Sequence, residues 1–135
     1  MPFVVDCSAT MAWIFPDEAT ESTDALRESL ADDMAVVPGL WPIEVGNVLL
    51  VATGRGRIHA RDWKRIHRDL ASLPIEIDPE TPERVFQAIM PLAFEHKLSA
   101  HDATYLELAI RLKLPLATLD KQLRAACRAA KVEVL

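Results

Sequence analysis

The sequence predicts an α/β fold in which helices surround a mostly parallel, five-stranded sheet. Short apolar runs alternate along the chain with longer helical patterns, the order that is typical of parallel strand–helix–strand units. The chain has 135 residues, a length that suits one compact domain, residues 1–135. Half of the residues are hydrophobic, so the chain can bury a sizeable core.

Five short apolar runs predict the strands, and each is bounded by turn or helix signals. The first run ends at Asp6, and the second ends at Pro38-Gly39. The predicted strands are residues 3–5, 34–37, 75–77, 116–118 and 132–134.

Helical patterns fill the segments between these runs. Pro42 and Pro82 suit first helical turns, and Gly54 suits a helix end. Pro91 removes a backbone donor within a helical pattern, so we expect a kink or break there. The predicted helices are residues 8–15, 18–32, 42–53, 61–73, 81–96, 99–113 and 121–130.

Composition argues against a membrane or secreted protein. No apolar run approaches the roughly 20 residues of a membrane span. The N-terminus has no basic stretch before its apolar run, so it does not resemble a signal peptide. Cys7 and Cys127 lack metal-type spacing, and we expect two free, buried thiols in a reducing cytoplasm.

The net charge of −5 conceals a local basic segment between residues 55 and 68. On the predicted helix there, Arg61, Arg65 and Arg68 line one side, where they could bind RNA phosphate. A solvated helix face explains them equally well. The acidic remainder of the chain would suit a basic protein partner.

Four carboxylates far apart in sequence are expected at one edge of the sheet. Asp6 ends the first strand, Asp120 follows the fourth, and Glu44 and Asp102 lie in the first turns of helices. Ligands of parallel sheets bind beyond the carboxyl ends of the strands, and helix N-termini favour negative charge there. Hard oxygen ligands of this kind suit Mg²⁺ or Mn²⁺.

Three of the four acids also have ordinary structural explanations. Asp120 could be a helix N-cap, and Asp102 lies at capping-box spacing from Ser99. Asp6 could simply turn the chain after its strand.

Glu44 is harder to explain in this way. Residues 41–52 are so apolar that the helix is expected to be largely buried, with Glu44 and Asn47 as its only strongly polar side chains. An unpaired buried carboxylate costs several kcal/mol, so a metal or a basic partner is expected beside it. An ordinary ion pair is the structural alternative.

Four sequence pieces carry a resemblance to a known family. They are, in order, Val-Val-Asp-Cys-Ser-Ala, Pro-Ile-Glu-Val-Gly-Asn-Val-Leu, Leu-Ser-Ala-His-Asp-Ala-Thr-Tyr-Leu-Glu-Leu-Ala and Leu-Ala-Thr-Leu-Asp-Lys-Gln-Leu. Together they resemble PIN domains, and specifically the VapC toxins of bacterial toxin–antitoxin pairs. The resemblance covers essentially the whole chain.

This resemblance implies a three-layer α/β/α sandwich and an Mg²⁺- or Mn²⁺-dependent endoribonuclease that leaves 5′-phosphate and 3′-hydroxyl ends. The acids of the family fall on Asp6, Glu44, Asp102 and Asp120. We expect the three aspartates to hold metal, and Glu44 to hold a second metal or orient the attacking water. The supporting polar positions of the family fall on Ser8, Asn47 and Thr118.

The resemblance also implies partners. It predicts a homodimer and a cognate antitoxin that inserts a segment into the cleft, with operator DNA bound only through the antitoxin. The RNA target stays open among transfer, ribosomal and messenger RNA, as does the number of metal ions.

Three other classes of protein are alternatives. Asp6 and Asp78 both follow strands, as in phosphoacceptor signalling domains, but Cys7 stands where such a domain needs a second acid. A phosphatase would need a second aspartate at Ser8. A PIN-fold binding module without activity is the other alternative, and metal titration with an RNA cleavage assay would distinguish it.

Overall fold

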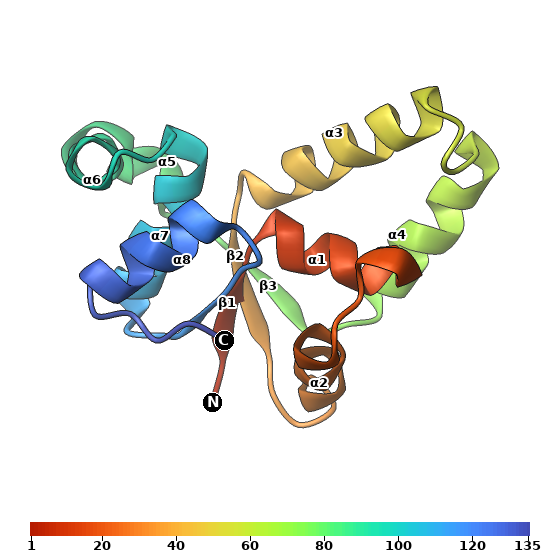
Figure 1. The fold of residues 1–135 in the computed structure, drawn as a ribbon, viewed down its shortest axis with the longest axis horizontal. Helices are drawn as coiled ribbons and strands as arrows, with labels where there is room; N and C mark the ends of the chain where they lie inside the picture. The colour runs from red at the N-terminus through yellow and green to blue at the C-terminus, as the bar shows by residue number, and fades with distance from the viewer.

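Four parallel strands form one sheet in the computed structural model, which describes all residues, 1–135 (Figure 1). The spatial order is β3-β2-β1-β4, so β1 is a central strand and β3 is an edge strand. Val4 of β1 lies opposite both Val36 and Leu116. The strands are β1 (Phe3–Val5), β2 (Ala35–Pro38), β3 (Ile75–Asp78) and β4 (Leu116–Ala117).

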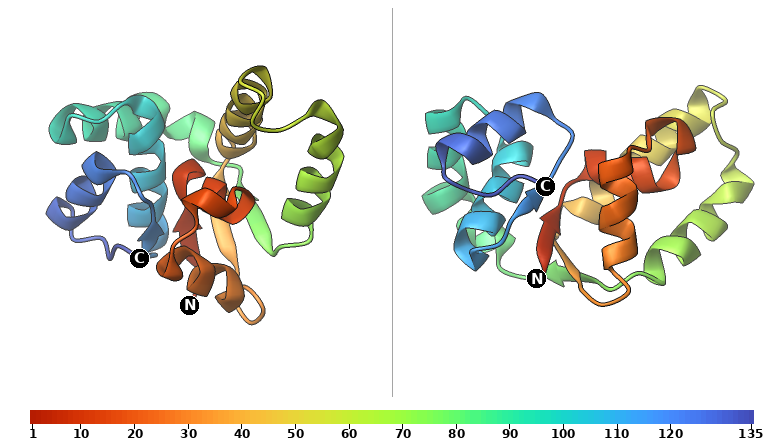
Figure 2. Two further views of the ribbon diagram at one scale, coloured as in Figure 1. Left: turned by 45° about the vertical axis from the view of Figure 1, so that its right-hand side comes forward. Right: turned by 60° about the horizontal axis from the view of Figure 1, so that its bottom comes forward.

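The predicted α/β class with a parallel sheet is confirmed, whereas the predicted fifth strand is wrong. Residues 132–134 form only one parallel bridge, between Leu116 and Val134. Strand β4 has only two residues, so residues 132–134 have little strand backbone with which to form hydrogen bonds. The three-layer arrangement stays a prediction, although helices lie on both sides of the sheet in Figures 1 and 2.

Helices fill the connections between the strands. In both figures α7 and α8 lie at one end of the molecule, and α4 lies at the other. The α-helices are α1 (Cys7–Ile14), α2 (Glu21–Ser29), α3 (Trp41–Gly54), α4 (Trp63–Ala71), α5 (Thr81–Arg84), α6 (Met90–His96), α7 (Ala100–Leu112) and α8 (Lys121–Ala129). Shorter helical segments are η1 (Pro16–Glu18), η2 (Ala60–Asp62) and η3 (Val85–Ile89).

Helix α7 is the helix most deeply embedded in the core. Residues 103–109 are all buried, and the helix packs against β1 and β2. The Ser99 side chain caps its start by accepting a hydrogen bond from the Asp102 amide at 3.1 Å, and Lys113 ends it in the left-handed region with φ 57°. The first turn of α7 is therefore fixed relative to the end of β1.

The interruption predicted at Pro91 is confirmed, and it takes the form of a π-helical turn. Segment η3 is a π-helix, in which the Met90 amide donates to the Val85 carbonyl. Pro91 lacks an amide hydrogen and occupies the first turn of α6, where such a hydrogen is not needed.

The expectation that α3 is largely buried is wrong. Trp41, Val45 and Ala52 are its only buried residues, whereas Ile43 is 72% and Leu50 is 58% exposed. One side of α3 packs against α1, and the other faces solvent. Several apolar side chains of α3 therefore remain exposed in the single chain. No helix combines the length and hydrophobicity required to span a bilayer.

A buried ion network fastens α7 to the end of β3. The Arg111 guanidinium donates to Asp78 at 2.9 and 3.2 Å and to Glu107 at 2.9 Å. The hydrogen bond from Arg111 lowers the pKa of Asp78, so this stabilisation is present at neutral pH and lost as the pH falls through that lowered pKa. Asp78 is thus occupied by an ion pair, which argues against the phosphoacceptor alternative.

We predict that Arg111→Met lowers the free energy of unfolding by about 3 kcal/mol, because it leaves two buried carboxylates without their cation. Urea denaturation followed by circular dichroism measures this loss. Arg65→Met is the control, since its contacts to Asp62 and Asp69 are exposed and 3.9 Å long. That control should change stability by less than about 0.5 kcal/mol, and equal losses in the two variants would contradict the prediction.

Candidate functional site

Asp6 is a buried carboxylate at the point where β1 ends and α1 begins. It is 5% exposed and is the N-cap of α1. Its Oδ1 accepts from Ser8 Oγ at 2.7 Å and from the Ala9 amide at 2.9 Å, and its Oδ2 accepts from Thr118 Oγ1. Because a carboxylate has about four acceptor positions, one position on Oδ2 is left for a ligand.

The two hydroxyls that hold Asp6 are themselves held in place. Ser8 Oγ accepts from the Leu119 amide at 2.9 Å, and Thr118 Oγ1 accepts from the Asp120 amide at 3.0 Å. The loop after β4 is therefore tied to the Asp6 carboxylate. Ser8 and Thr118 stand where the sequence placed them, beside the first acid.

Glu44 has a neutral partner rather than the ion pair that was the structural alternative. It is half-buried, and its Oε1 accepts a hydrogen bond from the Tyr105 hydroxyl. Sequence reasoning missed Tyr105, although its position three residues after Asp102 on a helix places both on adjacent positions of one face.

The carboxylates of Asp102 and Asp120 have different hydrogen-bond partners. Asp120 is the N-cap of α8 and accepts from the Leu123 amide at 2.8 Å, which confirms the capping explanation for that residue. The Asp102 amide is capped by Ser99, but no bond from the Asp102 carboxylate back to the Ser99 amide closes a capping box. The carboxylate is half-buried, and the Ser99 side chain is its one hydrogen-bond partner, so it keeps acceptor capacity for a ligand.

Asp102 lies within electrostatic reach of the other three acids. Burial raises the pKa of Asp102, and the charges of Asp120 and Glu44 raise it further. Burial likewise raises the pKa of Asp6, against the lowering effect of its three hydrogen bonds, and Asp102 adds to the rise. Like charges gathered in this way favour the binding of a cation.

The acids do not form a ready-made metal centre. No group of three or more His, Cys, Asp or Glu side chains is arranged to hold a metal ion. The type of donor nevertheless fits Mg²⁺ or Mn²⁺, because both ions prefer oxygen ligands. Asp6 and Asp102 each have a free acceptor position. The carboxylates would have to move closer together to share an ion.

The remaining predicted site residues lie outside this acidic region. Asn47 is exposed and makes no side-chain hydrogen bond. Arg61 of η2 and the α4 residues Arg65 and Arg68 are exposed, and α4 lies at the end of the molecule opposite α7 (Figures 1 and 2). The structure therefore does not bring this basic face into contact with the acids.

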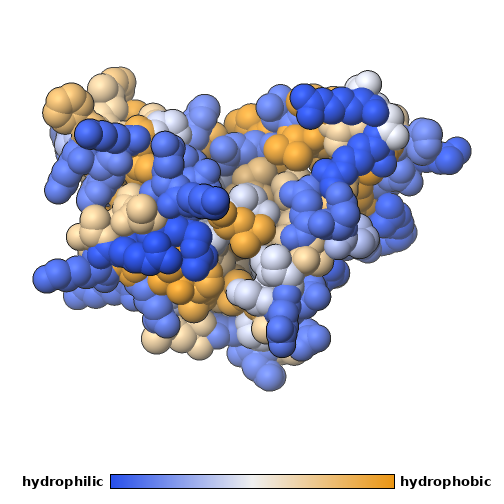
Figure 3. Space-filling view, viewed as in Figure 1, coloured by the Kyte–Doolittle hydropathy of each residue, from blue (hydrophilic) through white to orange (hydrophobic).

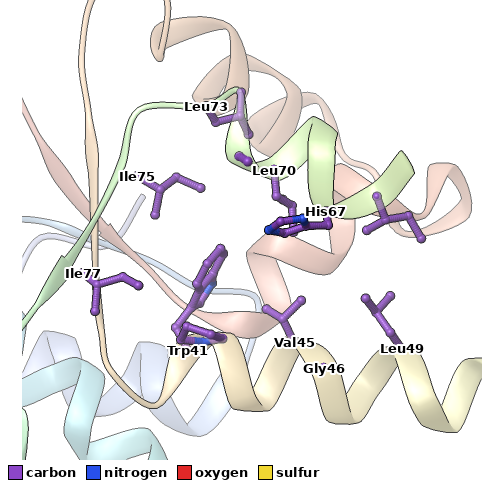
Figure 4. A pocket seen from close by; sticks show the side chains of 12 residues that line it. Trp41, Val45, Gly46, Leu49, His67, Leu70, Leu73, Ile75 and Ile77 are labelled. Carbon is purple, nitrogen blue, oxygen red and sulfur yellow. The ribbon is translucent and has the colours of Figure 1, made fainter. Parts of the chain in front are cut away.

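An apolar groove of about 400 Å³ lies between α3, α4 and the edge strand β3. Figure 4 shows Trp41, Val45 and Leu49 of α3 facing Leu70 of α4 across it, with Ile77 of β3 at one end. Ile77 is 50% exposed. The sequence did not predict this groove, because it depends on how far apart α3 and α4 are held.

A parallel α/β sheet with acids from β1, α3, α7 and α8 gathered near its carboxyl edge is the arrangement of a hydrolase that acts with acidic residues. Comparison with known proteins identifies the family. The PIN domain model matches residues 3–129, and the chain belongs to the PIN domain family.

Named relatives are similar along nearly their whole length. Ribonuclease VapC3 of Pyrobaculum aerophilum is 28% identical over 123 residues, which cover 91% of this chain and 92% of that protein. The crystal structure of PAE2754 from Pyrobaculum aerophilum superposes with a TM-score of 0.71 at 24% identity, covering 99% of this chain and 83% of that one. VapBC2 from Rickettsia felis, bound to a DNA fragment from their promoter, gives a TM-score of 0.66 at 12% identity, covering 100% and 98%. The resemblance to VapC toxins seen in the sequence is confirmed.

We predict that Asp6→Asn leaves the melting temperature at pH 7 unchanged or raises it by a few degrees. The raised pKa means that ionised Asp6 costs folding free energy at neutral pH, and this cost disappears as the pH falls through that pKa. Asparagine carries no charge, so its advantage should shrink on acidification. Calorimetry in EDTA between pH 7 and pH 4 measures the difference.

Asp78→Asn is the control with the opposite sign. The pKa of Asp78 is lowered by Arg111, so removal of its charge should lower the melting temperature at pH 7. A large loss of stability in Asp6→Asn would mean that the ionised carboxylate is needed for folding.

Proposed function

We propose that this protein is a metal-dependent endoribonuclease, the toxin of a type II toxin–antitoxin pair. The observation that carries the proposal is the set of acids Asp6, Glu44, Asp102 and Asp120 within a PIN domain, in which the charges of Glu44 and Asp120 raise the pKa of Asp102 and the charge of Asp102 raises the pKa of Asp6. Similarity to a protein named Ribonuclease VapC3 supports RNA as the substrate. The two free cysteines fit a reducing cytoplasm.

We assign Mg²⁺ or Mn²⁺ to Asp6, Asp102 and Asp120, with Glu44 holding a second ion or orienting water. When bound, such an ion lowers the pKa of a water molecule and stabilises negative charge on a phosphoryl group. Ser8 and Thr118 hold the Asp6 carboxylate in one orientation, which leaves a single acceptor position on Oδ2. Hydrolysis would leave 5′-phosphate and 3′-hydroxyl ends.

The basic face of η2 and α4, defined by Arg61, Arg65 and Arg68, is proposed to bind RNA phosphate away from the acids. Arg61 and Arg68 form no ion pair, and Arg65 has only two exposed contacts of 3.9 Å. Arg57, by contrast, is occupied by Asp17 and Glu18 and lies over Phe15. Arg61 and Arg68 are thus available to bind phosphate.

An antitoxin is the proposed protein partner, and operator DNA would be bound only through it. Support comes from the similarity to VapBC2, which was solved with promoter DNA. The apolar groove between α3 and α4 supplies a surface for an amphipathic segment of such a partner (Figure 4). Because this chain is acidic, it would attract a basic segment of the antitoxin. The basic side chains of that segment would bind Asp6 and Asp102.

A homodimer is proposed through the exposed stripe of η3 and α6, which consists of Phe86, Met90 and Phe94. These residues are 79%, 49% and 89% exposed, and Figure 3 shows hydrophobic residues over α6 at the upper left. The two phenylalanines alone present roughly 300 Å² of apolar surface, which is within the range of the largest, often functional, apolar patch on a monomer. A two-fold interface buries the same stripe from both subunits and would cover it.

Purified protein should cut total RNA in the presence of Mg²⁺ or Mn²⁺ and lose this activity in EDTA. Asp6→Asn should reduce the cleavage rate by at least about 100-fold, because the carboxylate that we assign to the metal loses its charge. Sequencing of the cut ends gives the RNA target and the end chemistry. Full metal-dependent activity in Asp6→Asn would remove the assignment.

Two further measurements test the basic face and the alternative of an inactive binding module. Replacement of Arg61, Arg65 and Arg68 by Gln should weaken RNA binding and flatten its dependence on salt. An intact, folded wild-type protein that binds RNA or a partner without cutting would instead be the PIN-fold binding module.

Phe94→Glu should convert the proposed dimer into a monomer, because it places a charge within the apolar stripe. Light scattering after size-exclusion chromatography measures the mass. Ile110→Glu is the control, since Ile110 is 41% exposed on α7 and outside the stripe. An unchanged mass in Phe94→Glu would exclude this face as the interface.

A further inference from the structure

Tyr105 is a core residue whose hydroxyl reaches one of the four acids, Glu44. It is the one tyrosine of the chain, is 1% exposed, and lies on α7 three residues after Asp102. Its ring is part of the main hydrophobic cluster, while its hydroxyl donates to Glu44 Oε1. One helix thus carries both an acid of the site and the group that holds another acid.

This hydroxyl is the one hydrogen-bond donor to the Glu44 carboxylate. At neutral pH a phenol carries its proton, so the Tyr105 hydroxyl is the donor of this bond and the Glu44 carboxylate is the acceptor. A buried phenol needs such a partner. The interaction therefore restrains both groups at once.

The first turn of α3, which carries Glu44, is tied on its other side to α1. Trp41 Nε1 donates to Thr10 Oγ1 at 2.9 Å, and Thr10 Oγ1 donates to the Asp6 carbonyl at 2.8 Å. These bonds fix the backbone of the turn. They leave the orientation of the Glu44 side chain to Tyr105.

Asp102 and Tyr105 lie three residues apart on α7, so the bond from Tyr105 holds Glu44 on the side of that helix that carries Asp102, where the two carboxylates repel each other. Without a donor, the Glu44 side chain would be free to turn away from Asp102 toward solvent, because Glu44 is only half-buried. The Tyr105 hydroxyl opposes this rotation.

We propose that Tyr105 is a positioning residue that holds the Glu44 carboxylate near Asp102 and thereby raises the affinity of the acidic site for a divalent metal. This inference rests on the proposed function. Tyr105 does not itself contact metal or RNA, and it acts through Glu44 alone.

The test compares wild type with Tyr105→Phe, Glu44→Gln and the double variant. Phenylalanine keeps the buried ring and removes only the hydroxyl. Thr104→Val is the matched control, since it removes a buried hydroxyl from the adjacent position of α7 that bonds only to its own helix, at Ala100. Each protein is measured for Mn²⁺ affinity by electron paramagnetic resonance, for kcat and KM on RNA, and for melting temperature in EDTA.

Tyr105→Phe should weaken Mn²⁺ binding and lower kcat by about 10-fold each, the usual effect of removing a group that orients a metal ligand. KM should stay unchanged, and Thr104→Val should behave as wild type. The double variant should lose no more than Glu44→Gln alone, because the hydroxyl acts only through Glu44.

Wild-type Mn²⁺ affinity and kcat in Tyr105→Phe would overturn the inference, and so would additive losses in the double variant. If wild type binds Mn²⁺ but cuts no RNA, the proposed ribonuclease fails while the Mn²⁺ titrations still decide the role of Tyr105. Absence of both Mn²⁺ binding and cleavage in wild type would overturn both.

Discussion

The acidic site depends on the ionised carboxylate of Asp6, which lies directly after β1 and is almost completely buried. Burial alone would protonate such a group or expel it. Ser8, the Ala9 amide and Thr118 oppose this by hydrogen bonding, and two of these donors are fixed in turn by the loop after β4. The position of that loop, and hence of Asp120 at the start of α8, follows from the need to satisfy Asp6.

Helix α7 supplies the second constraint, since it connects the core to the acids. Its middle is buried against β1 and β2, its far end is held by the Arg111 ion network, and its first turn presents Asp102. Tyr105 extends this rigidity to Glu44. The acids that repel one another are therefore carried by elements whose positions are set by packing, which keeps the charges gathered in the absence of a cation.

The surface around this core leaves several large apolar side chains exposed. Helix α3 exposes Ile43 and Leu50, α6 exposes Phe86 and Phe94, and an apolar groove opens between α3 and α4. A single chain that leaves so much apolar surface in water fits a protein that works with partners. The proposed antitoxin and second subunit would each cover a different one of these surfaces.

The sequence by itself determined the parallel α/β class, the positions of the four acids at strand and helix ends, the cap at Asp120 and the interruption at Pro91. These are local properties, because strand periodicity, capping and the missing proline donor are written in neighbouring residues. Only the tertiary structure decided that residues 132–134 make one bridge, that α3 is half exposed, and that Glu44 is held by Tyr105. Each of these depends on which elements meet in space, since a buried carboxylate requires a partner but its own sequence does not say which one will reach it.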